Sequence, residues 1–111
     1  MNKYNARKVQ IDGFTFDSQR EAERYSELKL MEKAGEITDL TVHPKIELQS
    51  GFYYKNERIR AITYEADFQY REKGNLIIED VKGMETQAFR IKWKLLQYKF
   101  RNTTMEFRKV K

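Results

Sequence analysis

The run Leu76-Ile77-Ile78-Glu79-Asp80-Val81 constrains the fold of this chain more than any other segment. A mostly apolar run of this length is typical of a central β-strand that is buried on both faces. Such a strand needs other strands for its backbone hydrogen bonds and helices to cover its side chains. With 111 residues and a hydrophobic fraction of 40%, the chain can build one such core, so we expect a single α/β domain over residues 1–111.

The N-terminal third carries turn and capping signals. Asp12-Gly13 lies between two short apolar segments, which indicates a β-hairpin over residues 8–17. Ser18 stands where a helix N-cap belongs, and Gly35 stands where a helix would end. We therefore expect a first helix over residues 19–34.

Extended segments follow the first helix. Residues 40–48 predict one broken or edge strand, because His43-Pro44 interrupts it and proline cannot donate to a sheet. Residues 61–70 alternate between apolar and polar side chains, which is typical of a strand with one buried face. The apolar face would consist of Ile62, Tyr64, Ala66, Phe68 and Tyr70. We expect the core to span residues 18–110 and residues 1–7 to be flexible.

A second helix is expected over residues 87–100, with Thr86 as its N-cap, and a last strand over residues 105–110. This helix has two apolar stripes, and we expect it to be buried on more than one side. One stripe is Ala88, Ile91, Leu95 and Tyr98, and the other is Phe89, Trp93, Leu96 and Phe100. After the hairpin, the expected order is helix, three strands, helix and strand.

Absent and rare residue types exclude several classes of function. The chain has no cysteine, which excludes a disulfide framework, a thiol nucleophile and a thiolate zinc site. Its single histidine, His43, excludes a histidine-rich metal cluster and argues against a Ser-His-Asp triad. The sequence contains no apolar run of the roughly 18 residues that a membrane helix needs, and it does not begin with a signal peptide. We expect a cytoplasmic protein without a membrane partner.

The charge of the chain is unevenly distributed. The net charge is +5, but residues 82–111 contain nine basic and two acidic residues, a local charge of +7. The first 81 residues therefore carry a net charge of −2. A basic region of this kind favours a polyanionic partner, nucleic acid above all, although a lopsided solvated surface would look the same.

Two carboxylates occur where a purely structural sheet would not need them. Asp67 lies late in the alternating strand, and Asp80 ends the apolar strand on the same face as Lys82, because strand side chains alternate. A short turn between these strands would bring the two aspartates together. Converging carboxylates repel each other unless a cation lies between them, and Mg²⁺ prefers such oxygen ligands. Alternatively, both aspartates end strands in solvent and Lys82 forms an ion pair.

Glu21 lies close to the midline of the apolar stripe of the first helix, since successive helical residues are about 100° apart. A carboxylate in this place is either a capping-box residue or a ligand directed into a site. Because Asp67 and Asp80 are expected on the sheet that this helix covers, we favour the ligand.

Further candidates for nucleic-acid contacts lie outside this group. Gln87 either reaches the substrate or is a polar residue of the first helical turn. Basic residues of the second helix either follow a phosphate backbone or form a solvated face: Arg90, Lys92, Lys94 and Lys99. The aromatic segment 52–54, beside basic residues, either stacks on exposed bases or packs inside a hairpin. His43 either lines the cleft or is structural, and we favour the structural role.

The chain has a glutamate in its first helix, Glu21, followed by Asp67 and then by Asp80-Val81-Lys82. This order resembles the pattern of the PD-(D/E)xK nuclease superfamily, which includes restriction enzymes and archaeal-type Holliday junction resolvases. Segments 16–22, 64–68 and 79–83 are more closely similar to a small phage and prophage family of uncharacterised function. The resemblance implies a restriction-endonuclease-like αβββαβ core, with a central mixed sheet flanked by two helices and preceded by the N-terminal hairpin. Ala66 replaces the proline of the pattern, and Asp80 replaces its commoner glutamate.

The resemblance also implies roles for individual residues. Asp67, Asp80 and the backbone carbonyl of Val81 would hold Mg²⁺ or Mn²⁺, Glu21 would support a ligand or a second ion, and Lys82 would assist the attacking water. The expected function is metal-dependent cleavage of DNA, selective for branched structures such as Holliday junctions, by a possible homodimer in phage or prophage DNA processing. The alternative is a DNA-binding phage accessory protein that keeps the fold and does not cut.

Overall fold

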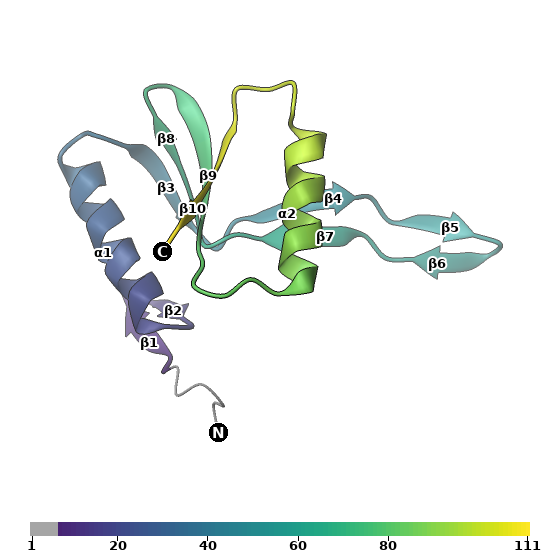
Figure 1. Ribbon diagram of the computed structural model, residues 1–111, viewed down its shortest axis with the longest axis horizontal. Helices are drawn as coiled ribbons and strands as arrows, with labels where there is room; N and C mark the ends of the chain where they lie inside the picture. Colours follow the sequence, from purple (N-terminus) through teal and green to yellow (C-terminus); the bar gives the residue numbers. More distant parts are fainter. Residues whose placement is uncertain (1–6) are drawn as a thin grey trace.

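The computed structural model describes residues 7–111, which contain a four-stranded mixed sheet with one helix on each face (Figure 1). In the strand order β10-β9-β8-β3, the pairs β3–β8 and β8–β9 are antiparallel and β9–β10 is parallel. The elements are α1 (Gln19–Lys33), β3 (Thr38–Val42), β8 (Phe68–Glu72), β9 (Asn75–Val81), α2 (Gln87–Lys99) and β10 (Glu106–Val110). The predicted α/β class, with a mixed central sheet and two helices, is confirmed.

The strand β9 is central and buried on both faces, as its apolar run predicts. Ile77 belongs to a core cluster beneath α1, whereas its neighbour Ile78 belongs to a second cluster beneath α2. The first cluster is built around Phe16, Tyr25, Leu28, Ile37, Phe68 and Tyr70, and the second around Tyr64, Phe89, Trp93 and Leu96. Alternation along one strand therefore divides the hydrophobic core into two halves.

The N-terminal hairpin and both helix caps follow the sequence signals. The strands β1 (Val9–Ile11) and β2 (Phe14–Phe16) are joined by Asp12 and Gly13, both with positive φ, as a two-residue hairpin turn requires. The hydroxyl of Ser18 accepts a hydrogen bond from the Glu21 N–H at 3.1 Å, and the hydroxyl of Thr86 caps α2 in the same way. Of the segment 1–7 that we expect to be flexible, all but Arg7 lies outside the described residues.

The predicted strand order needs one large correction, because seven strands rather than three lie between the two helices. Four of them form an arm that projects from the sheet (Figure 1). At its base β4 (Lys45–Gln49) pairs with β7 (Ile62–Glu65), and further out β5 (Phe52–Tyr54) pairs with β6 (Glu57–Ile59).

The arm is separated from the sheet by breaks in the two predicted strands, residues 40–48 and 61–70. His43 has a left-handed φ of 56° and Pro44 follows it, so the predicted strand 40–48 becomes β3 and β4. The predicted strand 61–70 breaks opposite, at Ala66 and Asp67, into β7 and β8. The breaks bond to each other: the His43 N–H donates to the Asp67 carbonyl at 2.9 Å and the Ala66 N–H to the Pro44 carbonyl at 3.0 Å.

The break also corrects the predicted apolar face of residues 61–70. Tyr64 and Ala66 pack in the cluster beneath α2, whereas Phe68 and Tyr70 pack in the cluster beneath α1. A continuous strand would have placed all four side chains on one side.

The helix α2 buries only one of its two apolar stripes. Phe89, Trp93 and Leu96 are buried, but Ile91 is 53% exposed, Leu95 44% and Tyr98 64%. The expectation that α2 is buried on more than one side is therefore wrong for this chain. Within residues 7–111, no helix has the length and apolar character needed to cross a membrane.

Candidate functional site

A polar cleft of about 540 Å³ lies between the first turn of α1, the break between β7 and β8, and the C-terminal end of β9. The side chains that the sequence singled out as a catalytic group all line it: Glu21, Asp67, Asp80 and Lys82, together with Val81. Residues that are up to 61 positions apart in the chain thus meet in one place. Each comes from the end of an element, where a side chain can leave the core and reach solvent.

Asp80 is the most deeply buried carboxylate in the cleft, with 1% of the residue exposed. Its Oδ2 atom has no hydrogen-bond partner among residues 7–111, and its Oδ1 atom lies 3.8 Å from the Lys82 ammonium. Burial raises the pKa of Asp80 to about 6, although Lys82 and the backbone of Asp67 act in the opposite direction. A buried carboxylate oxygen without a partner is costly, and a ligand bound to this atom would remove that cost.

Asp67 is held against the end of β9 by a backbone contact. Its Oδ2 atom accepts a hydrogen bond from the Val81 N–H at 2.7 Å. The residue precedes β8, whose first residue Phe68 pairs with Glu79, so the continued register of the β8–β9 ladder places Asp67 opposite Asp80 and next to the Val81 N–H. The short turn between two antiparallel strands therefore places the two aspartates in one cleft.

Glu21 reaches the cleft from the first turn of α1. The Ser18 hydroxyl contacts its backbone N–H at 3.1 Å and its Oε2 atom at 3.3 Å. The pKa of Glu21 is raised to about 8, first by burial, then by the negative charge of Asp67 and by a hydrogen bond with that carboxyl group. Glu21 therefore contacts its helix cap and faces a second carboxylate at the same time.

Lys82 provides a positive charge at the edge of the cleft. Its ammonium lies 3.8 Å from Asp80 Oδ1 and 4.6 Å from the centre of the Phe89 ring in α2. Between a carboxylate and an aromatic face, the lysine is held as a point charge beside the aspartates.

Five more polar side chains line the cleft: Lys8, Thr15, Asp17, His43 and Glu65. Lys8 pairs with Asp17 at 3.0 Å, and the His43 ring lies 5.7 Å from that of Phe16. The structural role that we favour for His43 thus coexists with a place in the cleft wall. Glu65 could have been found from its period-two spacing to Asp67, but Lys8 and Asp17 flank the hairpin and have no comparable sequence signal.

The polar and basic residues predicted along α2 do not line this cleft. Two of the lysines bind the base of the arm instead: Lys92 Nζ donates to the Thr63 carbonyl at 3.1 Å, and Lys99 Nζ donates to the Glu47 carbonyl. Arg90 lies 3.6 Å from Glu85. Gln87 and Lys94 are exposed on α2.

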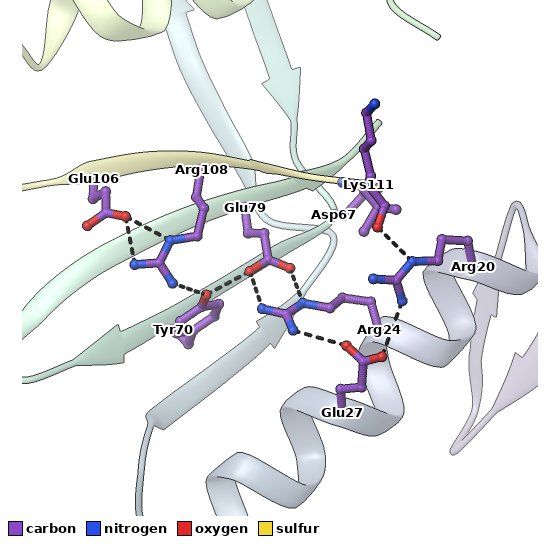
Figure 2. Close-up of polar contacts among 10 residues, drawn as sticks. Arg20, Arg24, Glu27, Asp67, Tyr70, Glu79, Glu106, Arg108 and Lys111 are labelled. Atoms are coloured by element: carbon purple, nitrogen blue, oxygen red, sulfur yellow. Dashed lines mark hydrogen bonds and ion pairs between the residues drawn. The ribbon is translucent and has the colours of Figure 1, made fainter. Parts of the chain in front are cut away.

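A buried ion-pair network behind the cleft fixes α1 to the sheet (Figure 2). Glu79 is fully buried, and its two oxygens accept hydrogen bonds from Arg24 Nε at 2.7 Å and Arg24 Nη2 at 2.9 Å. The Tyr70 hydroxyl donates to the same carboxylate at 2.7 Å, and burial with this bond raises the pKa of Tyr70 to about 12. Arg108 in β10 donates in turn to the Tyr70 hydroxyl at 3.0 Å.

This network was missed by sequence analysis, although it positions the cleft. Glu79 precedes Asp80 in β9, and Arg24 follows Glu21 by three residues in α1, so each partner adjoins a cleft carboxylate. The signal was a lone carboxylate in an apolar strand on the face that α1 covers. A bidentate arginine is the partner that such a buried carboxylate requires.

The side chains of the cleft have donor atoms that suit a hard divalent cation, but their arrangement suits such an ion less well. Within the described part of the chain, no three histidine, cysteine, aspartate or glutamate side chains are gathered as a metal site. The donors are nevertheless of the right type, because Asp67 and Asp80 supply carboxylate oxygens and one oxygen of Asp80 is buried without a partner. The pKa values of Glu21 and Asp80 are raised first by burial, so the ionised forms of these two carboxyl groups are unfavourable in the cleft.

A second hollow, of about 500 Å³, lies between α1 and the N-terminal hairpin. Its walls include Ile11, Tyr25 and Leu30 but none of the predicted catalytic residues. We therefore place the candidate site in the carboxylate cleft.

Comparison with known proteins gives one match. A family described as a protein of unknown function (DUF1064) matches residues 1–111. No curated protein and no solved structure matches the chain.

Proposed function

The chain belongs to the DUF1064 family, and from the chemistry of its cleft we propose that it is a metal-dependent endonuclease that hydrolyses DNA phosphodiester bonds. One observation carries the proposal: Glu21, Asp67, Asp80 and Lys82 converge in a single polar cleft. Three carboxylates beside one lysine suit the binding of a divalent cation together with a phosphate group.

The order of the core elements supports a restriction-endonuclease-like fold as part of this proposal. When the arm is left out, the elements after the hairpin are α1, β3, β8, β9, α2 and β10. This is the αβββαβ order that the resemblance to the PD-(D/E)xK superfamily implies. The parallel pair β9–β10, joined through α2, places the carboxylate-bearing end of β9 beside the start of that connection.

Each cleft residue has a role in the proposed reaction. Asp67 and Asp80 would hold Mg²⁺ or Mn²⁺, with the Val81 carbonyl as a further ligand. The ion, when bound, would lower the pKa of a water and offset the charge of the phosphate. Lys82 would orient the attacking water or stabilise charge on the phosphate oxygens, since its ammonium is fixed beside Asp80. Glu21 faces Asp67 and would keep that carboxylate in place.

The proposed substrate is DNA with an irregular structure, such as a branch, in phage or prophage DNA processing. The domain is small and its sequence has no evident module for reading a base sequence, which favours recognition of shape. A homodimer that presents two clefts to the two strands of a branch belongs to the same proposal.

The second candidate function is a DNA-binding accessory protein that does not cut. It is favoured by one observation: in residues 7–111 the carboxylates are not gathered into a group of three or more with the geometry of a metal site. Such a protein would keep the basic C-terminal region and use the cleft only for structure.

Nuclease assays test the proposal directly. We expect cleavage of plasmid, linear, single-stranded or four-way-junction DNA in Mg²⁺ or Mn²⁺ and none in EDTA. Asp80→Asn removes a proposed ligand, and Lys82→Ala removes the charge beside the water, so each variant should lose at least about 100-fold in rate.

Two matched controls remove the same charges outside the cleft. Glu36→Gln and Lys33→Ala change exposed residues near the end of α1 and should cleave like the wild type. Absence of metal-dependent cleavage on every substrate would overturn the proposal. Cleavage at the wild-type rate by both Asp80→Asn and Lys82→Ala would also overturn it. DNA binding without cleavage would favour the accessory protein.

A further inference from the structure

The arm formed by β4, β5, β6 and β7 is the most protruding part of the described chain (Figure 1). Its strand β7 ends at Glu65, two residues before Asp67, so the arm begins at the wall of the carboxylate cleft. The bonds from Lys92 to Thr63 and from Lys99 to Glu47 hold α2 against its base. The arm is thus continuous in the chain with the wall of the candidate site, and its base is held by α2.

Three consecutive aromatic residues on the outer hairpin of the arm are exposed. Phe52 is 44% exposed, Tyr53 73% and Tyr54 60%. Because strand side chains alternate, Tyr53 lies on one face, opposite Arg58, while Phe52 and Tyr54 lie on the other. A two-stranded hairpin has little stability of its own, and rings in solvent contribute almost nothing to it. Packing within the chain therefore does not account for these rings.

The charges around the rings point to a polyanion. The outer segment contains three basic residues, Lys55, Arg58 and Arg60, and one acidic residue, Glu57. The Lys55 ammonium lies 5.5 Å from the centre of the Tyr54 ring. Lys55 and Asn56 both have positive φ, which makes the tip a tight two-residue turn that presents the rings on a defined backbone.

The hairpin also has a hollow of about 410 Å³, lined by Gly51, Phe52, Tyr53 and Arg58. A side chain at Gly51 would place its Cβ only 3.2 Å from the Ile59 carbonyl, so glycine permits the close approach of the strands there. Tyr53 and Arg58 are paired across the hairpin and both line this hollow. An aromatic ring beside a planar guanidinium is a surface on which nucleobases stack.

From these observations we propose that the outer hairpin of the arm binds unpaired bases of a nucleic acid. In a regular duplex the base faces are covered by neighbouring base pairs, so only unpaired bases can reach Tyr53 and its neighbours. The basic side chains would bind the accompanying phosphates. This inference rests on the proposed function, because it assigns the unpaired part of the same DNA to the arm and the scissile phosphate to the cleft.

The length of the arm limits the distance between the unpaired bases bound at its tip and the scissile phosphate bound in the cleft. From Glu57 to Asp67 there are ten residues, which span at most roughly 33 Å in extended conformation. One helical turn of duplex DNA is about 34 Å long. A suitable substrate is therefore a fork, flap or branch whose unpaired bases lie within about one turn of the cleaved bond.

Binding measured in EDTA separates this inference from catalysis. Fluorescence anisotropy would compare a perfect duplex with the same duplex carrying an unpaired flap, for the wild type, Tyr53→Ala and Tyr98→Ala. Tyr98 is a matched control, because it is an exposed tyrosine (64%) that belongs to α2 and not to the outer hairpin. We expect Tyr53→Ala to weaken flap binding by at least roughly fivefold, to leave duplex binding unchanged, and Tyr98→Ala to match the wild type.

The outcomes distinguish the arm from the cleft. Unchanged flap binding by Tyr53→Ala, or an equal loss on duplex and flap, would overturn the role of the arm even if the wild type cuts DNA. Self-association lost in Tyr53→Ala, without a DNA effect, would also overturn it and point to a protein partner. Selective loss of flap binding without any cleavage in Mg²⁺ would support the arm and overturn the nuclease proposal.

Discussion

Asp80 is the most deeply buried carboxylate of the cleft. It combines almost complete burial with an oxygen that has no hydrogen-bond partner in the described part of the chain, and Lys82 at 3.8 Å only partly offsets this. A second unfavourable contact joins Glu21 to Asp67, whose negative charge opposes the ionisation of Glu21. We therefore expect the metal-free protein to be less stable when all the carboxylates of the cleft are ionised.

The raised pKa of Glu21 gives a prediction for the metal-free protein. The group titrates near 4.5 when unfolded and near 8 when folded, so between these values the folded state holds a proton that the unfolded state has lost. The free energy of unfolding should therefore fall as the pH rises from about 4.5 to 8. The slope should stay below the single-proton limit of about 1.4 kcal/mol per pH unit, because water screens a half-buried group.

Urea unfolding in EDTA at several pH values measures this slope. Glu21→Gln should flatten the decline, whereas Glu23→Gln, an exposed carboxylate on the same helix, should follow the wild type. Parallel curves for the wild type and Glu21→Gln would contradict the assignment of the proton to Glu21.

Sequence reasoning reached part of this site because strand geometry is regular. Period two places Asp80 and Lys82 on one face of a strand, and helical periodicity directs Glu21 towards the core. It did not reach Lys8 and Asp17, whose positions depend on where the hairpin rests against the cleft. No local pattern encodes a contact of that kind.

The contact between α1 and β9 depends on one buried ion pair, Arg24 with Glu79. Arg24→Ala would leave a fully buried carboxylate without its bidentate partner, which should cost roughly 3–5 kcal/mol. Arg20→Ala is the matched control on the same helix: Arg20 is more exposed and binds Glu27 and the Lys111 carbonyl, so about 1 kcal/mol or less should be lost. Urea unfolding measures both, and equal losses would show that the network does not anchor α1.

The two faces of α2 give a second prediction at the level of elements. Leu96 is fully buried, so Leu96→Ala should lower the free energy of unfolding by roughly 2–5 kcal/mol. Its neighbour Leu95 is 44% exposed, so Leu95→Ala should change it by about 0.5 kcal/mol or less. Thermal or urea unfolding distinguishes them. A large loss in Leu95→Ala would mean that the outer stripe of α2 is covered in solution.

The strands around the arm show where pattern analysis fails. Residues 61–70 alternate without interruption, and nothing in that alternation marks the break at Ala66 and Asp67. The break is stabilised by hydrogen bonds to His43 and Pro44, more than 20 residues away. The proline in the other strand was the signal available, and it correctly indicated an interruption there. The break in the partner strand, residues 61–70, could be predicted only if the pairing of the two strands were already known.

At the scale of the whole molecule, the apolar run of β9 predicted the architecture because a strand buried on both faces requires cover on both sides. The sheet with α1 on one face and α2 on the other follows from that requirement. The arm does not follow from it, because its outer strands β5 and β6 are largely exposed, and only the base of the arm, through Tyr64 in β7, joins the core. The proposed nuclease combines both parts: the buried core fixes the carboxylates, and the exposed arm extends away from them.

The rate of DNA cleavage as a function of Mg²⁺ concentration tests the central claim most directly. In single-turnover reactions on a branched DNA, the wild-type rate should be negligible in EDTA and should rise to saturation with Mg²⁺, while Asp80→Asn should stay at least about 100-fold slower. Cleavage that persists in EDTA, or identical Mg²⁺ curves for the wild type and Asp80→Asn, would contradict the assignment of this cleft as a metal-dependent active site.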